Sequence, residues 1–162
     1  MADDHRRSLA WLEERIAAGT AFRELAQAAV THLRARYPDY DWVGIYMLEG
    51  AGLRLWAWDG PAATEHVEIP LDQGVCGYAA SSGEVINVPD VNQDPRYLQC
   101  FLGTRAELVV PIATGGRVFG EIDIDSDRLG AFDEGDEAFV RAFCGRLAVA
   151  AERDALASRT PG

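Results

Sequence analysis

The sequence predicts an α+β domain in which helices gather on one side of a central antiparallel sheet. Apolar residues recur at three-to-four spacing near both ends of the chain, over residues 6–37 and about 134–158. Between these segments, short runs alternate apolar and polar residues and are separated by glycine-rich turns. A length of 162 residues is typical of one domain, with a core at about 20–150 and a loose tail at 159–162.

The helical region near the N-terminus divides at Gly19 and Thr20. We expect Gly19 to end the first helix and Thr20 to cap the second, which stops before Pro38. The repeating apolar positions are Leu9, Leu12 and Ile16, then Phe22, Leu25, Ala26, Ala29 and Leu33. In the last helix, Asp133 is the expected N-cap.

Six strands are expected between the helices. Their ranges are 41–48, 53–58, 66–71, 85–88, 107–113 and 117–125. A short helix over about 75–82, closed by Gly83, and a long loop over 89–104 complete the order. Thr114, Gly115 and Gly116 form the hairpin turn between the last two strands.

The composition excludes several classes of protein. A net charge of −11 should repel nucleic acid and anionic membranes. No apolar run is long enough for a membrane span, and the charged N-terminus lacks the apolar segment of a signal peptide. With 48% hydrophobic and 25% charged residues, we expect a globular, cytoplasmic protein that contacts neither nucleic acid nor membrane.

Carboxylates collect on one face of the last two strands. Alternation places Glu121, Asp123 and Asp125, with Phe119, opposite the apolar face of Val118, Ile122 and Ile124. A three-residue hairpin loop would set Glu107 directly across from Asp123. The face is either solvated or a carboxylate cluster whose members raise one another's pKa, which would supply a general acid or a clamp for an ammonium group.

Trp42, Gly44 and Tyr46 share one face of the first strand. These aromatic rings pack in the core, or they flank a gap over Gly44 that accepts a small ligand group. No metal site is expected. Asp123, Asp125 and Asp127 begin like a calcium loop, but Arg128 stands where such a loop requires glycine.

The three cysteines are Cys76, Cys100 and Cys144, and their spacing excludes the common zinc ribbon. Cys144 lies on the apolar stripe of the last helix and should be packed and inert. Cys76 lies in the first turn of the short helix, where the helix dipole can lower the pKa of a thiol. Cys100 lies in the long loop, near Arg96 and Arg105, which could stabilise a thiolate.

Several motifs occur together in one order. They are DWVGIY, IPLDQGVCG, VPDV, AELVVPI and GEIDIDSD, and Cys100 follows the cysteine of GVCG by 24 positions. This combination resembles the free methionine-(R)-sulfoxide reductases, which are single-domain GAF proteins, over roughly residues 20–150. The resemblance implies a GAF fold, with terminal helices on one face of the sheet and a pocket lined by a helix and loops on the other.

The resemblance also implies roles for individual residues. Cys100 would attack the sulfoxide sulfur, release methionine and become a sulfenic acid. Cys76 would condense with it to a disulfide, which thioredoxin then reduces. Trp42 and Tyr46 would surround the methyl-sulfoxide end of the substrate. The family's carboxylates, here Glu107, Asp123 and Asp125, would bind substrate, and Glu107 and Asp125 would assist protonation of its oxygen.

Two positions depart from the family pattern. His66 stands where a third cysteine is common, which leaves resolution to Cys76 alone or to an external thiol. The segment before Cys100 is RYLQC instead of a sequence close to GHIAC, which bears on specificity. The implied function is reduction of free L-methionine-(R)-sulfoxide in oxidative-stress repair, without a bound cofactor and with thioredoxin as partner and reductant. The alternatives are a non-catalytic GAF module that binds a small metabolite or nucleotide, and a structural dimerisation domain; a homodimer is compatible with each.

Overall fold

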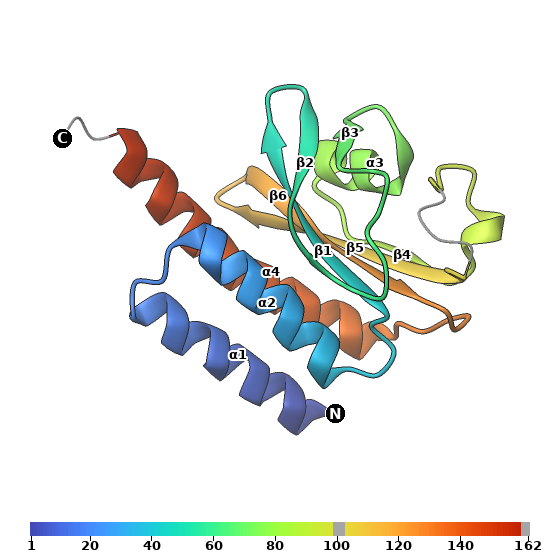
Figure 1. Ribbon diagram of the computed structural model, residues 1–162, viewed down its shortest axis with the longest axis horizontal. Helices are drawn as coiled ribbons and strands as arrows, with labels where there is room; N and C mark the ends of the chain where they lie inside the picture. Colours follow the sequence, from blue (N-terminus) through green and yellow to red (C-terminus); the bar gives the residue numbers. More distant parts are fainter. Residues whose placement is uncertain (99–102, 160–162) are drawn as a thin grey trace.

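A six-stranded antiparallel sheet divides the molecule into two layers (Figure 1). The structure is a computed structural model and describes residues 1–98 and 103–159. The strands are β1 (Trp42–Glu49), β2 (Gly52–Asp59), β3 (Glu68–Pro70), β4 (Ile86–Val88), β5 (Ala106–Thr114) and β6 (Arg117–Ser126). Their order across the sheet is β3-β2-β1-β6-β5-β4, so the first and last long strands meet at its centre.

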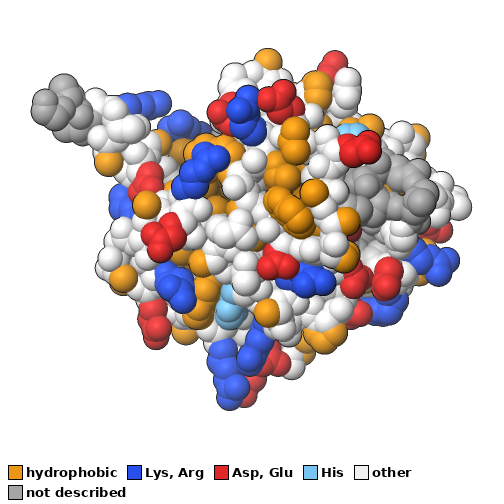
Figure 2. All heavy atoms as spheres, viewed as in Figure 1, with side chains coloured by type: hydrophobic (Ala, Val, Ile, Leu, Met, Phe, Trp, Pro, Cys, Tyr) orange, Lys and Arg blue, Asp and Glu red, His pale blue; other side chains and the backbone are white. Residues whose placement is uncertain are grey.

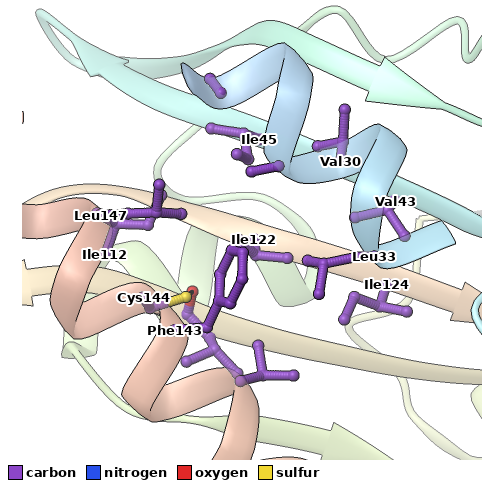
Figure 3. Packing of buried hydrophobic residues seen from close by; sticks show 14 of the residues in the cluster. Val30, Leu33, Val43, Ile45, Ile112, Ile122, Ile124, Phe143, Cys144 and Leu147 are labelled. Carbon is purple, nitrogen blue, oxygen red and sulfur yellow. Dashed lines mark hydrogen bonds between the residues drawn. The ribbon is translucent and has the colours of Figure 1, made fainter. Parts of the chain in front are cut away.

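Three helices cover one face of the sheet, as predicted. They are α1 (Ala2–Ala17), α2 (Phe22–Arg36) and α4 (Glu134–Arg159), and they lie together in Figure 1. The apolar stripes of α2 and α4 pack on the residues of β1, β5 and β6 that face them (Figure 3), and α1 packs on α2 and α4. Cys144 is part of this core and is 1% exposed, so the prediction that it is packed is confirmed.

The other face carries a smaller layer. It consists of α3 (Gly74–Ser82) and the connections around a 3-10 turn, η1 (Val91–Gln93). A second apolar cluster lies beneath α3 and includes Trp42, Tyr46, Cys76 and Val109. Alternation along β1 and β6 therefore directs one set of side chains to the helices and the other set to α3.

The start of α2 differs from the prediction. Thr20 does not cap the helix, because Ala21 is at the N-cap position and makes no side-chain cap bond. The backbone N–H of Phe22 instead donates to Oδ2 of Asp154 on α4, at 2.7 Å. A carboxylate from a distant helix thus performs the capping role, a contact that local sequence cannot reveal. The predicted cap of α4 is confirmed, since Asp133 accepts from the Asp136 N–H and Asp136 accepts from the Asp133 N–H.

The β5–β6 hairpin differs from the prediction in register. Its loop contains only Gly115 and Gly116, both with positive φ, and a bulge follows between Ile112 and Ala113. The shorter loop and the bulge each shift the pairing by one residue, so Glu107 lies opposite Asp125 instead of Asp123.

Because of the same bulge, the side chains of Val118 and Phe119, near the turn, lie on the faces opposite to those predicted. Phe119 packs in the helix-side core instead of on the carboxylate face where it was predicted. Val118 lies on the α3 side, where its Cγ2 would be 3.9 Å from a Cβ added at Gly83. Beyond the bulge, Glu121, Asp123 and Asp125 keep the predicted face.

The outer surface carries charges of both signs. Figure 2 shows arginine and acidic side chains interspersed over one face of the molecule. Within the described residues, none of the helices has both the length and the apolarity needed to cross a bilayer.

Candidate active site

Strand β6 carries a row of carboxyl groups into the layer beneath α3. Glu121, Asp123 and Asp125 are at most 3% exposed, and Glu107 on the neighbouring strand is 5% exposed. Asp125 lies between Trp42 on β1 and Glu107 on β5, and Asp123 pairs with Gly44 and Val109. A solvated polar face is thereby excluded, and the carboxylate cluster is the correct alternative.

The thiol of Cys76 points at this cluster. Its Sγ lies 3.4 Å from Oδ2 of Asp123 and 4.0 Å from Oε1 of Glu107, and the thiol donates toward both. Helix α3 comes close because Gly77 faces the end of β3, where an added Cβ would be 2.9 Å from the carbonyl oxygens of Pro70 and Leu71. The structure thus brings together Cys76, Glu107 and Asp123, which lie far apart in the sequence.

Burial controls the protonation of this cluster. It raises the pKa of Asp123 and, with the nearby charge of Asp123, raises the pKa of Asp125 well above its usual range. The pKa of Glu121 is also raised well above its usual range, again mainly by burial. A raised pKa favours the neutral form of a carboxyl group, which can donate protons and hydrogen bonds.

Cys76 is in the first turn of α3, as predicted, but the expected lowering of its pKa is wrong. Burial raises the pKa of the thiol well above its usual value, and Asp123, Glu121 and Glu107 raise it further. Burial and the neighbouring acidic groups together outweigh the short helix's dipole. Cys76 therefore rests as a thiol and needs a proton acceptor before it can react.

Glu121 was not predicted as a site residue, although its place on the carboxylate face followed from alternation. It is fully buried, and its carboxyl group interacts with the Cys76 thiol. The signal was the acidic residue at every second position of GEIDIDSD. This pattern applies to Glu121 as much as to Asp123 and Asp125, so Glu121 could have been included among the predicted site residues.

The predicted gap over Gly44 is closed. A Cβ at Gly44 would lie 2.3 Å from Cη2 of Trp42, so the indole ring itself covers the glycine. The opposite side of the ring meets Gly60, where a Cβ would be 2.3 Å from Cδ1, and Trp58 stacks at 6.4 Å. These two glycines therefore hold the Trp42 ring and do not provide a slot for a ligand.

Tyr46 is the second aromatic residue of this strand and is fully buried. Its hydroxyl donates to the backbone carbonyl of His66 at 2.8 Å. This bond ties β1 to the segment before β3, so His66 contributes a main-chain acceptor near the site.

A cavity of about 260 Å³ lies at the open end of the cluster. It is lined by Asp41, Trp42, Pro61, Gly103, Thr104, Asp125, Ser126 and Asp127. Cys100 itself lies outside the described residues. After residue 102 the described chain resumes at Gly103, and Gly103 and Thr104 line the cavity. Before residue 99 it ends at Leu98, which packs against Gly74 at the start of α3; a Cβ added at Gly74 would be 2.8 Å from the Leu98 side chain.

Arg96, predicted as a stabiliser of a thiolate, and Cys144, predicted to be inert, are both engaged elsewhere. Arg96 makes a bidentate pair with Asp94, at 3.0 and 2.7 Å, and lies over the ring of Tyr78. The thiol of Cys144 donates to the carbonyl of Val110 at 3.6 Å, and burial raises its pKa. Cys144 is thus held away from the carboxylate cluster by the sheet.

Comparison with known proteins identifies the fold and the family. A family model described as "GAF domain" matches residues 21–151. A free methionine-R-sulfoxide reductase of Escherichia coli is 33% identical over 115 residues, which cover 71% of this chain and 68% of the relative.

Solved structures agree with this result. The type II free methionine-R-sulfoxide reductase of Thermoplasma acidophilum is 41% identical, with a TM-score of 0.77, and covers 82% of this chain and 96% of its own. The free methionine-R-sulfoxide reductase of Neisseria meningitidis, solved in complex with its substrate, is 30% identical with a TM-score of 0.87 and covers 94% and 91%. The chain is a GAF-domain protein and belongs to the free methionine-R-sulfoxide reductase family of oxidoreductases.

Proposed function

We propose that this protein reduces free L-methionine-(R)-sulfoxide to methionine by cysteine chemistry. The observation that carries the proposal is the approach of the Cys76 thiol to Asp123 and Glu107, beside the cavity lined by Trp42 and Asp125. The Neisseria relative, by its description, binds its substrate on the same fold. A thiol beside carboxyl groups of raised pKa is suited to a reaction that consumes protons and electrons.

In the first step, the Cys100 sulfur attacks the sulfoxide sulfur. The cysteine is oxidised to a sulfenic acid, methionine is released, and the sulfoxide oxygen stays on the cysteine. Sulfoxide oxygen leaves the substrate sulfur readily only when protonated, and Asp125 or Glu107 supplies that proton. Asp123 and its neighbours bind the substrate's ammonium group, while Trp42 and Tyr46 surround its apolar end.

In the second step, the Cys76 thiol displaces water from the sulfenic acid and forms a disulfide with Cys100. The thiol proton passes by way of the carboxylate left by the first step to the hydroxyl of the sulfenic acid, which leaves as water, because Asp123 and Glu107 lie within reach of Sγ. Thioredoxin then reduces the disulfide, itself becoming oxidised, and both thiols are restored. A cytoplasmic location agrees with such a reductant.

The test is turnover of each epimer of free methionine sulfoxide with thioredoxin and thioredoxin reductase. We expect consumption of reducing equivalents with the R epimer and none with the S epimer. Cys100→Ser should abolish turnover, whereas Cys144→Ser, which alters a thiol buried in the helix-side core, should retain it. Absence of turnover with both epimers would reject the enzyme and favour a GAF module that binds a small metabolite.

A further inference from the structure

Cys76, Glu107 and Asp123 place one thiol and two carboxyl groups around a common point. One ligand atom from each lies within 4.8 Å of the others, and all three side chains are buried. In a tetrahedral zinc site, with bonds of about 2.3 Å to sulfur and 2.1 Å to oxygen, these ligands are about 3.6 Å apart. The observed separations of Sγ from Asp123 Oδ2 and Glu107 Oε1, 3.4 and 4.0 Å, lie on either side of that value.

The cluster also contains acceptor atoms without donors. Asp123 is 1% exposed, and its Oδ1 has no hydrogen-bond partner among residues 1–98 and 103–159. The fully buried Glu121 interacts with the same thiol, but neither of its carboxyl oxygens has a well-formed hydrogen bond to another described residue. Buried acceptors without donors are rare and costly, and they point to a ligand that is positively charged or rich in donors.

Within the described part of the chain, no positively charged side chain pairs with the carboxyl group of Asp123 or of Glu121. The sequence contains no lysine, and none of the ion pairs made by arginine includes Asp123 or Glu121. The outer surface, in contrast, has arginine beside acidic groups on the face shown in Figure 2.

We propose that the reduced protein binds a thiophilic divalent cation of the zinc class through Cys76 Sγ and one carboxylate oxygen each of Glu107 and Asp123. A thiolate ligand favours zinc or cadmium over magnesium and calcium, which prefer sites made only of oxygen. Three protein ligands leave a fourth position for water or a substrate group. The ligands form no local sequence motif, since Cys76 and Asp123 are 47 positions apart. For this reason the sequence alone predicts no metal site.

Binding would have a direct consequence for reactivity. The cation holds the Cys76 sulfur as a ligand and occupies carboxylates that we propose bind the substrate. It would therefore inhibit turnover, and disulfide formation at Cys76 would release it. This consequence rests on the proposed function, whereas cation binding itself does not.

The test is titration of the reduced full-length protein with cadmium chloride, in a phosphine reductant, following the sulfur-to-cadmium charge-transfer band in the ultraviolet. We expect one equivalent per chain in the wild type, in Cys144→Ser and in Cys100→Ser. The band should disappear in Cys76→Ser, and the affinity should fall at least about tenfold in Asp123→Asn and Glu107→Gln, as for loss of a metal ligand or its support. Excess magnesium should not displace the cadmium.

Glu152→Gln, which removes an exposed acid on α4, is the matched control and should bind as the wild type does. Circular dichroism of each variant without metal verifies that it is folded. Persistence of the band in Cys76→Ser, or its absence from the folded wild type, would overturn the proposal. Cadmium binding without sulfoxide turnover would reject the proposed function and leave the metal site standing.

Discussion

The thiol of Cys76 and the carboxyl group of Asp123 lie 3.4 Å apart, although they belong to different layers of the fold. The first comes from the start of α3 and the second from the central strand β6. Both are buried, and burial raises the pKa of both groups. In this arrangement the thiol stays protonated at rest and has an acceptor at hand when it reacts.

Replacement of either cysteine of the proposed pair should stop the cycle at a different point. In Cys76→Ser, the first step proceeds once and the enzyme stops as a sulfenic acid, because no neighbouring thiol resolves it. In Cys100→Ser, no methionine is released at all. Rapid-quench measurement of methionine per enzyme distinguishes them. Sustained turnover by Cys76→Ser at the wild-type rate would show that another thiol performs resolution.

Asp123→Asn removes an acidic group while preserving its size. We expect kcat/KM to fall about a hundredfold, the usual contribution of a group that positions or transfers a proton. The steady-state rate at varied concentrations of the R epimer measures the effect. Glu152→Gln on the helix side should leave kcat/KM unchanged, and an equal decrease in both variants would attribute the loss to net charge.

Gly44→Ala tests how Trp42 is held. The added methyl would lie 2.3 Å from the indole ring, so the ring must move. We expect a loss of about 1–3 kcal/mol in unfolding free energy and a higher KM, measured by denaturant titration and steady-state kinetics. Gly145→Ala is the control, because an added Cβ there meets nothing within 4 Å. It should stabilise the exposed face of α4 by about 1 kcal/mol.

His32 should make the helix layer sensitive to acid. Burial, followed by Arg36 and Arg15, lowers the pKa of His32 below 6.5, and the ring nitrogen lies 2.8 Å from Oγ of Ser8. The unfolded chain therefore binds the proton more readily than the folded chain does. This contribution to stability is complete above pH 6.5 and is lost as pH falls through the lower folded pKa.

The measurement is the Tm of the wild type and of His32→Gln at several pH values from 7.5 down to about 5. The Tm of the wild type should fall relative to that of the variant below pH 6.5. Comparison of the two proteins cancels the opposite trend of the buried carboxyl groups. A constant difference across this range would contradict the lowered pKa of His32.

The sequence was sufficient to predict the order of the helices and strands and the face on which the carboxylates lie. Periodicity decides both, because one face of each strand must be apolar when it packs on helices. The register of β5 and β6 required more, since Gly115 and Gly116 alone form the loop and the bulge is invisible in the pattern. The two-residue loop and the bulge each shift the pairing of β5 with β6 by one residue.

Contacts between distant segments account for the other differences. The cap of α2 comes from Asp154, and the space over Gly44 is filled by the ring of Trp42. The raised pKa of Cys76 depends first on its burial and then on carboxyl groups that only the folded sheet brings near it. From local sequence, the helix dipole was expected to lower the pKa of the Cys76 thiol. In the folded protein the pKa is raised instead.

The most direct test of the account is the state of Cys76 after exposure to one equivalent of substrate without reductant. After the R epimer, peptide mapping by mass spectrometry should find Cys76 joined to Cys100, with Cys144 as a free thiol. The S epimer should leave all of these thiols free. If the R epimer releases methionine while Cys76 stays a thiol, or if Cys76 is joined to Cys144, the assignment of Cys76 as the resolving cysteine is wrong.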